Sequence, residues 1–336
     1  MNLTPKVRKT LDIAIRLVIA TLSLSYIFYR IYALSLGQLN AFAESVYNGE
    51  NAIYIAAALL LLMTINWGIE SLKWKLLISQ AETISFLTSY VAVLAGLAVS
   101  VFTPNRVGEF FGRVFILKRT DPLKAILLTI VGSFSQLLVT IVLGSAAYLV
   151  FAPRYLTSLM YDSTWLVSGF SITLVMLSLV LIFAFFNISV FHRISILIPE
   201  KYSGRIRNSI DAMADCHTPL LIKTVLLSTL RYLVFSTQFY LALRLMGLPF
   251  TVLQCMMIIP VIYLVLAAIP TMALTELGVR GSVSVFLFGL LSLTGVLDAE
   301  TTLAVVSAST LIWIINIAVP SMAGVLVVFR IKFFRR

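Results

Sequence analysis

The sequence predicts an all-α fold, a polytopic transmembrane helical bundle in a single domain, and three observations support this prediction. Of the 336 residues, 60% are hydrophobic and only 12% are charged, whereas about 25% of the residues of a soluble domain are charged. The mean hydropathy is +1.02. Apolar runs of about twenty residues, each able to cross a hydrocarbon core about 30 Å thick, recur from end to end. The sequence therefore excludes an ordinary soluble protein.

The charge and the cysteines exclude other classes. In a membrane protein, the formal net charge of +11 indicates cytoplasmic loops that face anionic lipid, and no nucleic-acid motif accompanies it. Cys216 and Cys255 form neither a metal-binding spacing nor a disulfide framework. Neither a phosphate-binding glycine loop nor a nucleophile–base arrangement is present. We therefore expect no cofactor, no metal, no nucleic-acid partner and no enzymatic activity.

The first half of the chain begins with a basic segment and an apolar run at about 11–34. This run is longer than the apolar core of a signal peptide, about 7–15 residues, so we interpret it as an uncleaved first span. A second span follows at about 51–70. The next apolar segments, 84–102 and 106–117, are separated by "TPNRVGE", which combines a proline, a glycine and charges. A further span is predicted at 123–150.

The distribution of basic residues indicates which of these segments cross the membrane. If 84–102 crossed fully, the basic residues after it and the basic loop at about 191–223 would lie outside, against the positive-inside bias. If 84–117 instead enters from the cytoplasm, turns and returns, the basic loops lie inside. They then include Lys6, Arg8, Lys9, Lys73, Lys75, Lys118, Arg119, Lys124, Arg193, Lys201, Arg205, Arg207 and Lys223. We therefore predict a re-entrant hairpin and a cytoplasmic N-terminus.

The second half repeats this order. Spans are predicted at about 165–190, 222–246 and 301–329, and the tail "FRIKFFRR" should be cytoplasmic. The segment 250–296 must then enter and leave from outside, with its turn at "IPTMALTELGVRGS", Ile269–Ser282. Between the first two of these spans, "GRIRNSIDAMADCH" has an apolar face opposite its charges, which indicates a short helix on the cytoplasmic surface.

The two halves, about 1–150 and 160–336, therefore form an inverted-topology repeat of about six full spans and two re-entrant helical hairpins. Both termini are expected to be cytoplasmic, and the protein is expected to be a multi-pass protein of the plasma (inner) membrane. This architecture is associated with transporters whose sites lie near the midplane at broken helices.

Charged residues of the two turns are the candidate substrate-binding groups. A charge at the bilayer centre costs about 2.5–3.5 kcal/mol on insertion scales, so Arg106, Glu109, Glu276 and Arg280 should face the interior of the bundle. Glu109 precedes Arg113 by four residues and Glu276 precedes Arg280 by four, which places each acid beside a base on one helical face. These groups either line a substrate site or only neutralise each other and close the turns.

Other residues are expected to shape the turns or to join the helices. Proline breaks a helix and glycine permits close backbone approach; the turn residues are Thr103, Pro104, Gly108, Pro270 and Gly278. Arg231, inside a predicted span, either lines the cavity or extends to the interface. Glu70 is interpreted as an interfacial residue near Lys73. Helix–helix hydrogen bonds are expected from Asn66, Gln136, Gln238 and Asn316.

The segment "TPNRVGEFFGRVFILKR" resembles the signature of the lysylphosphatidylglycerol synthase transmembrane-region family, also called flippase-like. Members typically carry Thr-Pro-x-x-x-Gly-Glu followed by an aromatic and a basic residue, and a later Pro…Gly-x-Arg segment. The matching residues are Thr103, Pro104, Gly108, Glu109, Phe110 and Arg113, then Pro270, Gly278 and Arg280. The family often has Gly-Gly after the first proline, where this chain has Asn105 and Arg106.

This resemblance implies a lipid-translocating module without the aminoacyl-transferase domain of the best-known members. With the turns, it predicts a flippase-like protein with membrane lipids as partners. The protein would translocate or bind an anionic lipid, either a phospholipid or a polyprenyl-phosphate-linked amphiphile such as a lipid-linked glycan. Two alternatives remain: a non-transporting assembly partner of a cell-envelope lipid or glycan pathway, and a membrane transferase that uses a lipid-phosphate donor.

Overall fold

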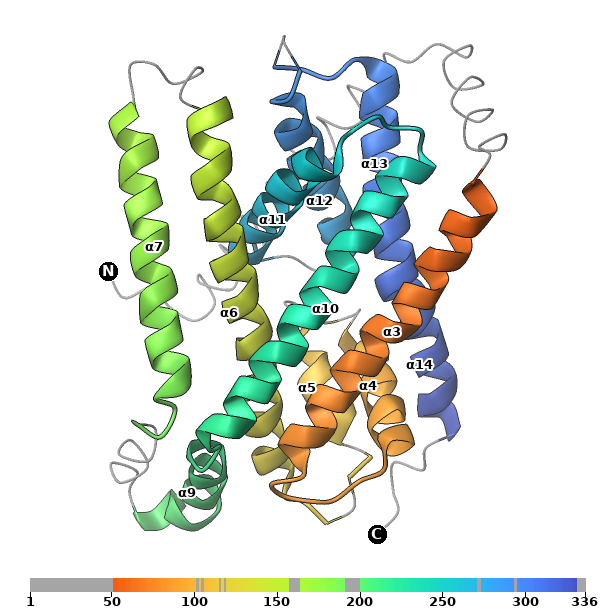
Figure 1. Ribbon diagram of the computed structural model, residues 1–336. Coiled ribbons are helices and arrows are strands. Elements are labelled where there is room, and N and C mark those ends of the chain that lie inside the picture. The colour runs from red at the N-terminus through yellow and green to blue at the C-terminus, as the bar shows by residue number, and fades with distance from the viewer. Residues whose placement is uncertain are drawn as a thin grey trace, which may run out of the picture.

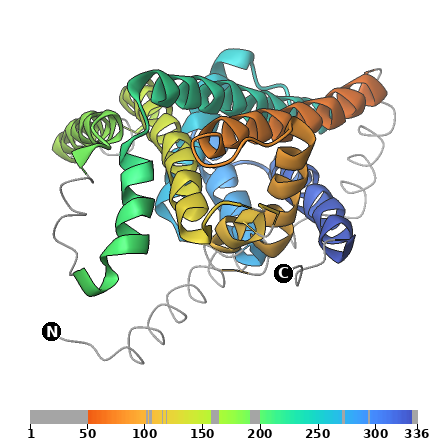
Figure 2. The same cartoon turned by 90° about the horizontal axis from the view of Figure 1, so that it is seen from below.

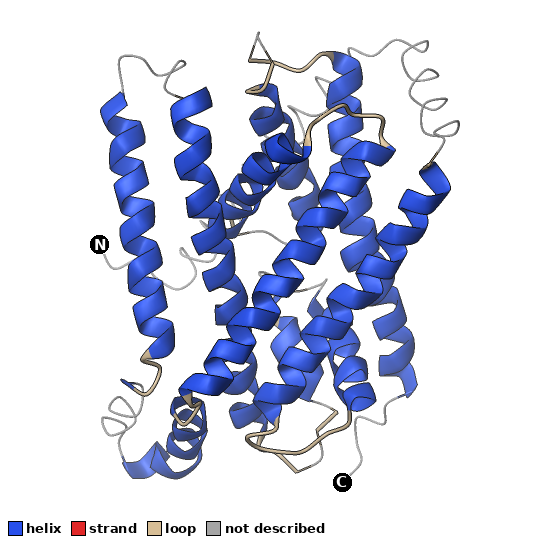
Figure 3. Ribbon diagram, viewed as in Figure 1, coloured by secondary structure: helices blue, strands red, loops and turns tan. Residues whose placement is uncertain are grey.

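The computed structural model describes residues 51–100, 103, 106–114, 116–117, 119–156, 164–190, 200–270, 273–292 and 295–330. The regular secondary structure in these ranges is helical (Figure 3). The predicted first span, Pro104 and Asn105 lie outside the described residues. Within the described residues, five helical segments are long and apolar enough to cross a membrane: Ala52–Ile78, Pro122–Tyr155, Thr164–Phe186, Thr218–Leu245 and Ala299–Gly324. The chain is therefore an all-α, multi-pass membrane protein, consistent with the plasma membrane.

The helices follow the predicted order closely. They are α3 (Ala52–Ile78), α4 (Phe86–Ser100), α5 (Gly108–Val114), α6 (Pro122–Tyr155), α7 (Thr164–Phe186), α9 (Glu200–Ala214), α10 (Thr218–Leu245), α11 (Val252–Ala268), α12 (Ala273–Gly289), α13 (Ala299–Trp313), the π-helix η3 (Ile314–Ala318) and α14 (Val319–Arg330). The amphipathic segment predicted at the surface is α9, at the lower end of the molecule and beside α6 (Figures 1 and 2).

The helices α3 and α10 pack along each other across one face of the molecule (Figures 1 and 2). The buried residues of α3 include Leu59, Asn66, Glu70 and Leu77, whose successive spacing of four or seven residues marks one helical face. The rest of α3 is also apolar, and side chains such as Leu61 are exposed. A helix that is apolar all round needs a nonaqueous environment, so its outer face contacts lipid.

The helices α4 and α5 form a tight hairpin that opens toward the lower end of the molecule (Figure 1). A Cβ atom on Gly112 would lie 2.6 Å from the Cα of Gly96, so the two helices touch through their backbones. The helix α14 packs against α4 just as closely, because a Cβ on Gly324 would lie 2.0 Å from the carbonyl oxygen of Leu94.

The helices α11 and α12 form a second hairpin, which opens toward the opposite end (Figure 1). The helix α11 packs against α6, where a Cβ on Gly144 would lie 2.7 Å from the Cβ of Leu264. The helix α12 begins at Ala273, inside the segment expected as a turn, so Gly278 and Arg280 are helical. Each hairpin thus packs against a long helix from the other half of the chain.

The last predicted span, 301–329, contains a π-helix that the sequence analysis did not anticipate. Residues Ile314–Ala318 separate α13 from α14. Pro320 has no N–H to donate to the carbonyl of Asn316, four residues earlier, and π-bulges occur where the regular hydrogen-bond ladder is interrupted. The irregular turn places Asn316 in the interior of the bundle, where it is buried.

We predict that Gly324→Ala and Gly144→Ala each destabilise the protein by about 1–3 kcal/mol, the usual cost of overpacking. The added methyl groups would overlap Leu94 and Leu264. Gly169→Ala in α7 is the matched control, since no atom lies within 4 Å of its added Cβ. Thermal unfolding in detergent measures the effect. Equal midpoints for Gly324→Ala and Gly169→Ala would contradict the close packing.

Candidate functional site

A buried carboxylate, Glu70 of α3, lies at the centre of the candidate site. It is only 5% exposed. Its Oε2 atom lies 2.8 Å from Nζ of Lys73 and 3.0 Å from Nη1 of Arg231. Its Oε1 atom lies 2.9 Å from Nη2 of Arg113. One carboxylate therefore joins cations from α3, α5 and α10.

The interpretation of Glu70 as an interfacial residue is wrong. The helix α3 continues to Ile78, two turns beyond the predicted end of this span, so Glu70 lies inside the helix. Lys73, which the sequence analysis placed among the cytoplasmic loop residues, is 1% exposed and pairs with Glu70. The sequence did contain a signal for this buried pair. Glu70 and Lys73 are an acid and a base three residues apart at the end of an apolar segment, and charges inside a membrane span usually mark functional sites.

The cluster contains more positive than negative charge. Arg113 also pairs with Glu109, the partner that their spacing of four residues predicted. Nζ of Lys73 also donates to Oγ of Ser228, at 3.3 Å. Three cations therefore share two carboxylates within this group of described residues. Buried charge without full compensation is costly, so an anionic ligand beside the cluster would be stabilised.

A chain of side-chain amides extends the cluster toward the π-helix. Nε of Arg231 donates to Oδ1 of Asn66 at 2.9 Å, and Nδ2 of Asn66 donates to Oδ1 of Asn316 at 2.9 Å. Arg231 therefore points into the protein. The predicted role of the amides in joining helices is confirmed here, and Gln238 donates to the carbonyl of Leu59. Gln136 donates to the carbonyl of Ser228 at 3.4 Å.

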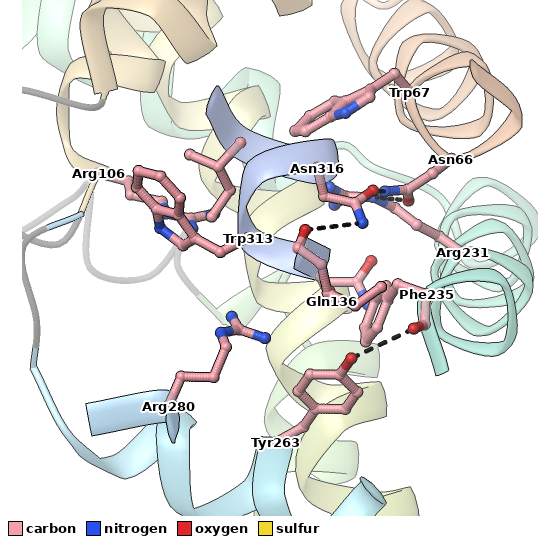
Figure 4. Close-up of a pocket in the computed structure, with 12 residues that line it drawn as sticks. Asn66, Trp67, Arg106, Gln136, Arg231, Phe235, Tyr263, Arg280, Trp313 and Asn316 are labelled. Carbon is pink, nitrogen blue, oxygen red and sulfur yellow. Dashed lines mark hydrogen bonds between the residues drawn. The ribbon is translucent and has the colours of Figure 1, made fainter. Parts of the chain in front are cut away.

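Two adjacent cavities lie beside this network. The first has a volume of about 210 Å³ and is lined by Arg106, Arg231 and Arg280 (Figure 4). No acidic residue is among the described side chains that line it. The second, of about 310 Å³, is lined by Glu70 and by residues that include Lys73, Arg106, Glu109 and Arg231. Arg106, Gln136 and Arg231 line both cavities, so the two cavities adjoin at these polar side chains.

Aromatic side chains and unused hydrogen-bond donors complete the first cavity. The guanidinium carbon of Arg231 lies 5.0 Å from the ring centre of Trp67, and that of Arg280 lies 5.8 Å from the ring centre of Tyr263. These are cation–π distances. Among the described residues, no hydrogen-bond partner is found for the buried Nε1 atoms of Trp67 and Trp313. Buried donors are normally satisfied, so this cavity suits a ligand rich in acceptor oxygens.

Arg106 has an unusual backbone conformation at the tip of the first hairpin. Its φ is 57°, in the left-handed region that glycine adopts freely and that other residues adopt at a cost. Such strain persists where the surrounding structure imposes it, often at functional sites. Thr103 Oγ1 accepts a hydrogen bond from the N–H of Gly108 at 2.8 Å, and a Cβ on Gly108 would lie 2.5 Å from the carbonyl oxygen of Val99.

Four of the six predicted substrate-binding residues line these cavities, and the other two are not among the described lining residues. Arg106, Glu109, Arg231 and Arg280 are the lining residues. Arg113 is 2% exposed and contacts Glu70 and Glu109 without lining either cavity, so it positions the two carboxylates. The side chain of Glu276 lies outside the described residues. Pro270 is exposed immediately before α12, and Gly278 is buried within α12.

Comparison with known proteins gives one match. The family model described as "Lysylphosphatidylglycerol synthase TM region" matches residues 13–324. No curated protein and no solved structure matches the chain. The matched range includes both hairpins and every residue that lines the two cavities.

We predict that Glu70→Gln lowers the free energy of unfolding by about 3–5 kcal/mol, the usual cost of removing one partner from a buried ion pair. Three cations would lose their shared carboxylate. Glu300→Gln, at an exposed position in the first turn of α13, is the control and should cost at most about 1 kcal/mol. Thermal unfolding in detergent compares them. If the two variants have the same midpoint of thermal unfolding, Glu70 does not hold the cluster together.

Proposed function

This chain belongs to the family of the lysylphosphatidylglycerol synthase TM region, and on this premise we propose that it moves an anionic lipid across the bilayer. The lipid phosphate binds in the two cavities, on Arg106, Arg231 and Arg280, while the hydrocarbon chains remain in the membrane. The lipid is a phospholipid or a polyprenyl-phosphate-linked amphiphile. The role is transport rather than catalysis.

One observation carries this proposal: the first cavity has three arginines and no acidic residue among its described lining side chains. Arg231 lies near the middle of the 28-residue α10, about 20 Å from either end at 1.5 Å per residue. Ionisable groups at this depth are costly and usually functional. A guanidinium donates paired hydrogen bonds to phosphate oxygens, and the indole N–H groups of Trp67 and Trp313 can donate to the remaining oxygens.

We further propose that the two helical hairpins are re-entrant and enter the membrane from opposite sides. Their open ends lie at opposite ends of the molecule (Figure 1), and the basic loops favour a cytoplasmic position for the open end of α4–α5. The two termini are then cytoplasmic, and the chain consists of inverted repeats at about 1–150 and 160–336. In such repeats, rocking of one half against the other exposes a central site alternately to each side.

The charges suggest how the headgroup travels. Glu70 and Glu109 hold the cations when no lipid is bound, and Glu109 remains partly exposed. A phosphate that enters the second cavity replaces part of this compensation at Arg106 and Arg231. These two arginines also line the first cavity, so the phosphate can pass to Arg280 without losing all its cationic partners. The aromatic side chains beside Arg231 and Arg280 keep those guanidinium groups in place.

We predict that Arg106→Gly and Arg280→Ala each slow the movement of a fluorescent anionic phospholipid in proteoliposomes about tenfold or more. Loss of a hydrogen bond to a charged group costs about 1.5–3 kcal/mol. Glycine is chosen at Arg106 because it adopts the observed φ without strain. Arg244→Ala, exposed in the last turn of α10, removes an equal charge outside the cavities. Rates unchanged from the wild type in both cavity variants would contradict the proposal.

The hairpin topology is tested by labelling added cysteines with a membrane-impermeant maleimide. Gln80→Cys and Arg119→Cys flank α4–α5, and Val252→Cys and Val296→Cys flank α11–α12; all four positions are exposed. We predict labelling of the first pair from the cytoplasmic side only and of the second pair from the outer side only. If α4 and α5 together crossed the bilayer, Gln80→Cys and Arg119→Cys would label from opposite sides.

The native thiols should contribute little to this labelling. Burial, together with the nearby Asp215 carboxylate, raises the pKa of Cys216 to about 11. At pH 7 this thiol is therefore protonated, and the reactive thiolate is scarce. Cys255 is buried in α11. Unmodified wild-type protein measures the remaining background.

A further inference from the structure

Another pocket, of about 250 Å³, lies between α6, α10 and α11. Its lining is almost entirely apolar and includes Leu233 and Met256, which are 49% and 45% exposed. In a bilayer these exposed apolar side chains contact lipid, so the pocket is accessible to hydrocarbon. Its position is not that of the polar cavities described above.

A small aromatic cluster connects the lining of this pocket with that of the first polar cavity. Phe235 and Tyr263 line the polar cavity, and Tyr232 lines the apolar pocket. The ring centre of Tyr232 lies 5.1 Å from that of Phe235 and 6.0 Å from that of Tyr263. The two spaces are therefore neighbours that adjoin at this aromatic cluster.

Two buried hydroxyl groups face an apolar environment in this pocket. Tyr232 and Ser236 are 2% and 5% exposed, and the part of the chain that the structure describes offers their hydroxyl oxygens no hydrogen-bond partner. They lie one turn apart on α10 and therefore on the same helical face. An apolar cavity of about 150 Å³ stays dry, so water is not the expected partner. Buried hydroxyl groups are normally satisfied, and a ligand that brings an acceptor oxygen would satisfy both.

The depth of these hydroxyl groups restricts the ligand. Tyr232 directly follows Arg231 near the middle of the 28-residue α10. The interfacial regions of a bilayer, where lipid headgroups lie, are outside the hydrocarbon core. A lipid acceptor group reaches the middle of the membrane only when its headgroup has entered the protein. The acceptor must therefore lie close to a phosphate bound at Arg231, with a hydrocarbon chain beyond it.

We propose that Tyr232 and Ser236 bind the ester carbonyl of a glycerophospholipid, while the adjoining acyl chain occupies the apolar pocket. One carbonyl oxygen has two lone pairs and can accept from both hydroxyl groups. This inference rests on the proposed function and selects between its two substrate classes. An ester-linked glycerophospholipid has this carbonyl beside its phosphate, and a polyprenyl phosphate does not.

The test compares ester-linked phosphatidylglycerol with its ether-linked analogue of the same chain length. Native mass spectrometry of the purified full chain measures which lipid is retained when both are present. We expect the wild type to retain the ester lipid about three- to tenfold better, the gain of one to two neutral hydrogen bonds. Tyr232→Phe with Ser236→Ala should remove this preference by weakening the ester lipid alone.

The variants are conservative because neither hydroxyl group has a partner among the described residues. The midpoint of thermal unfolding should therefore not fall. Ser309→Ala is the matched control. Its buried hydroxyl likewise has no partner within the described ranges, and Ser309 is not among the described residues that line the three spaces. This control should keep the full preference for the ester lipid.

Three results would overturn the inference. The wild type could retain the two lipids equally, or the preference for the ester lipid could survive in the double variant. A polyprenyl phosphate could also compete for binding as strongly as the ester lipid does. The lipid-movement assay separates this failure from failure of the proposed function. If the protein prefers the ester lipid but moves no lipid, the result supports the subsite and contradicts the transport role. If the protein moves the ester and ether lipids equally, the result supports transport and contradicts the subsite.

Discussion

The ion-pair cluster around Glu70 is the interaction on which the rest of the structure depends. One buried carboxylate contacts Lys73, Arg113 and Arg231, and these cations come from α3, α5 and α10. In a bilayer such cations are tolerated only when paired or beside polar space. The cluster therefore fixes α5, the second helix of the α4–α5 hairpin, against α3 and α10. The same excess of positive charge among the described residues is the basis for our proposal that the adjoining cavities bind an anion.

Close backbone packing allows this cluster to lie in the middle of the molecule. At Gly324 and at Gly144, each hairpin contacts a long helix from the other half with no space for a further methyl group. The hairpin tips can therefore reach the interior, where Arg106 and Arg280 line one cavity. The apolar pocket lies next to it, and under the proposed function it would hold a hydrocarbon chain beside the bound phosphate. A lipid needs that combination if its headgroup is to pass through protein while its chains stay in the membrane.

Most of the fold, but only part of the site, could be predicted from the sequence. Hydrophobic length located the helices, and the spacing of Glu109 and Arg113 gave their ion pair, because both depend on nearby residues. Glu70 was misplaced because its partners Arg113 and Arg231 are 43 and 161 residues away. The π-helix at Ile314–Ala318 and the unpartnered donors of Trp67 and Trp313 also depend on tertiary packing, which no local pattern records.

The central claim is that an anionic lipid headgroup enters the cavity between the hairpin tips. The most direct measurement is photo-crosslinking with a phospholipid that carries a diazirine on its headgroup, followed by peptide mapping. We predict crosslinks on the cavity residues of α3, α12 and η3, near Trp67, Arg280 and Asn316, and fewer of them when unlabelled anionic lipid competes. Crosslinks confined to lipid-facing side chains such as Trp165 and Phe183 of α7 would contradict the claim.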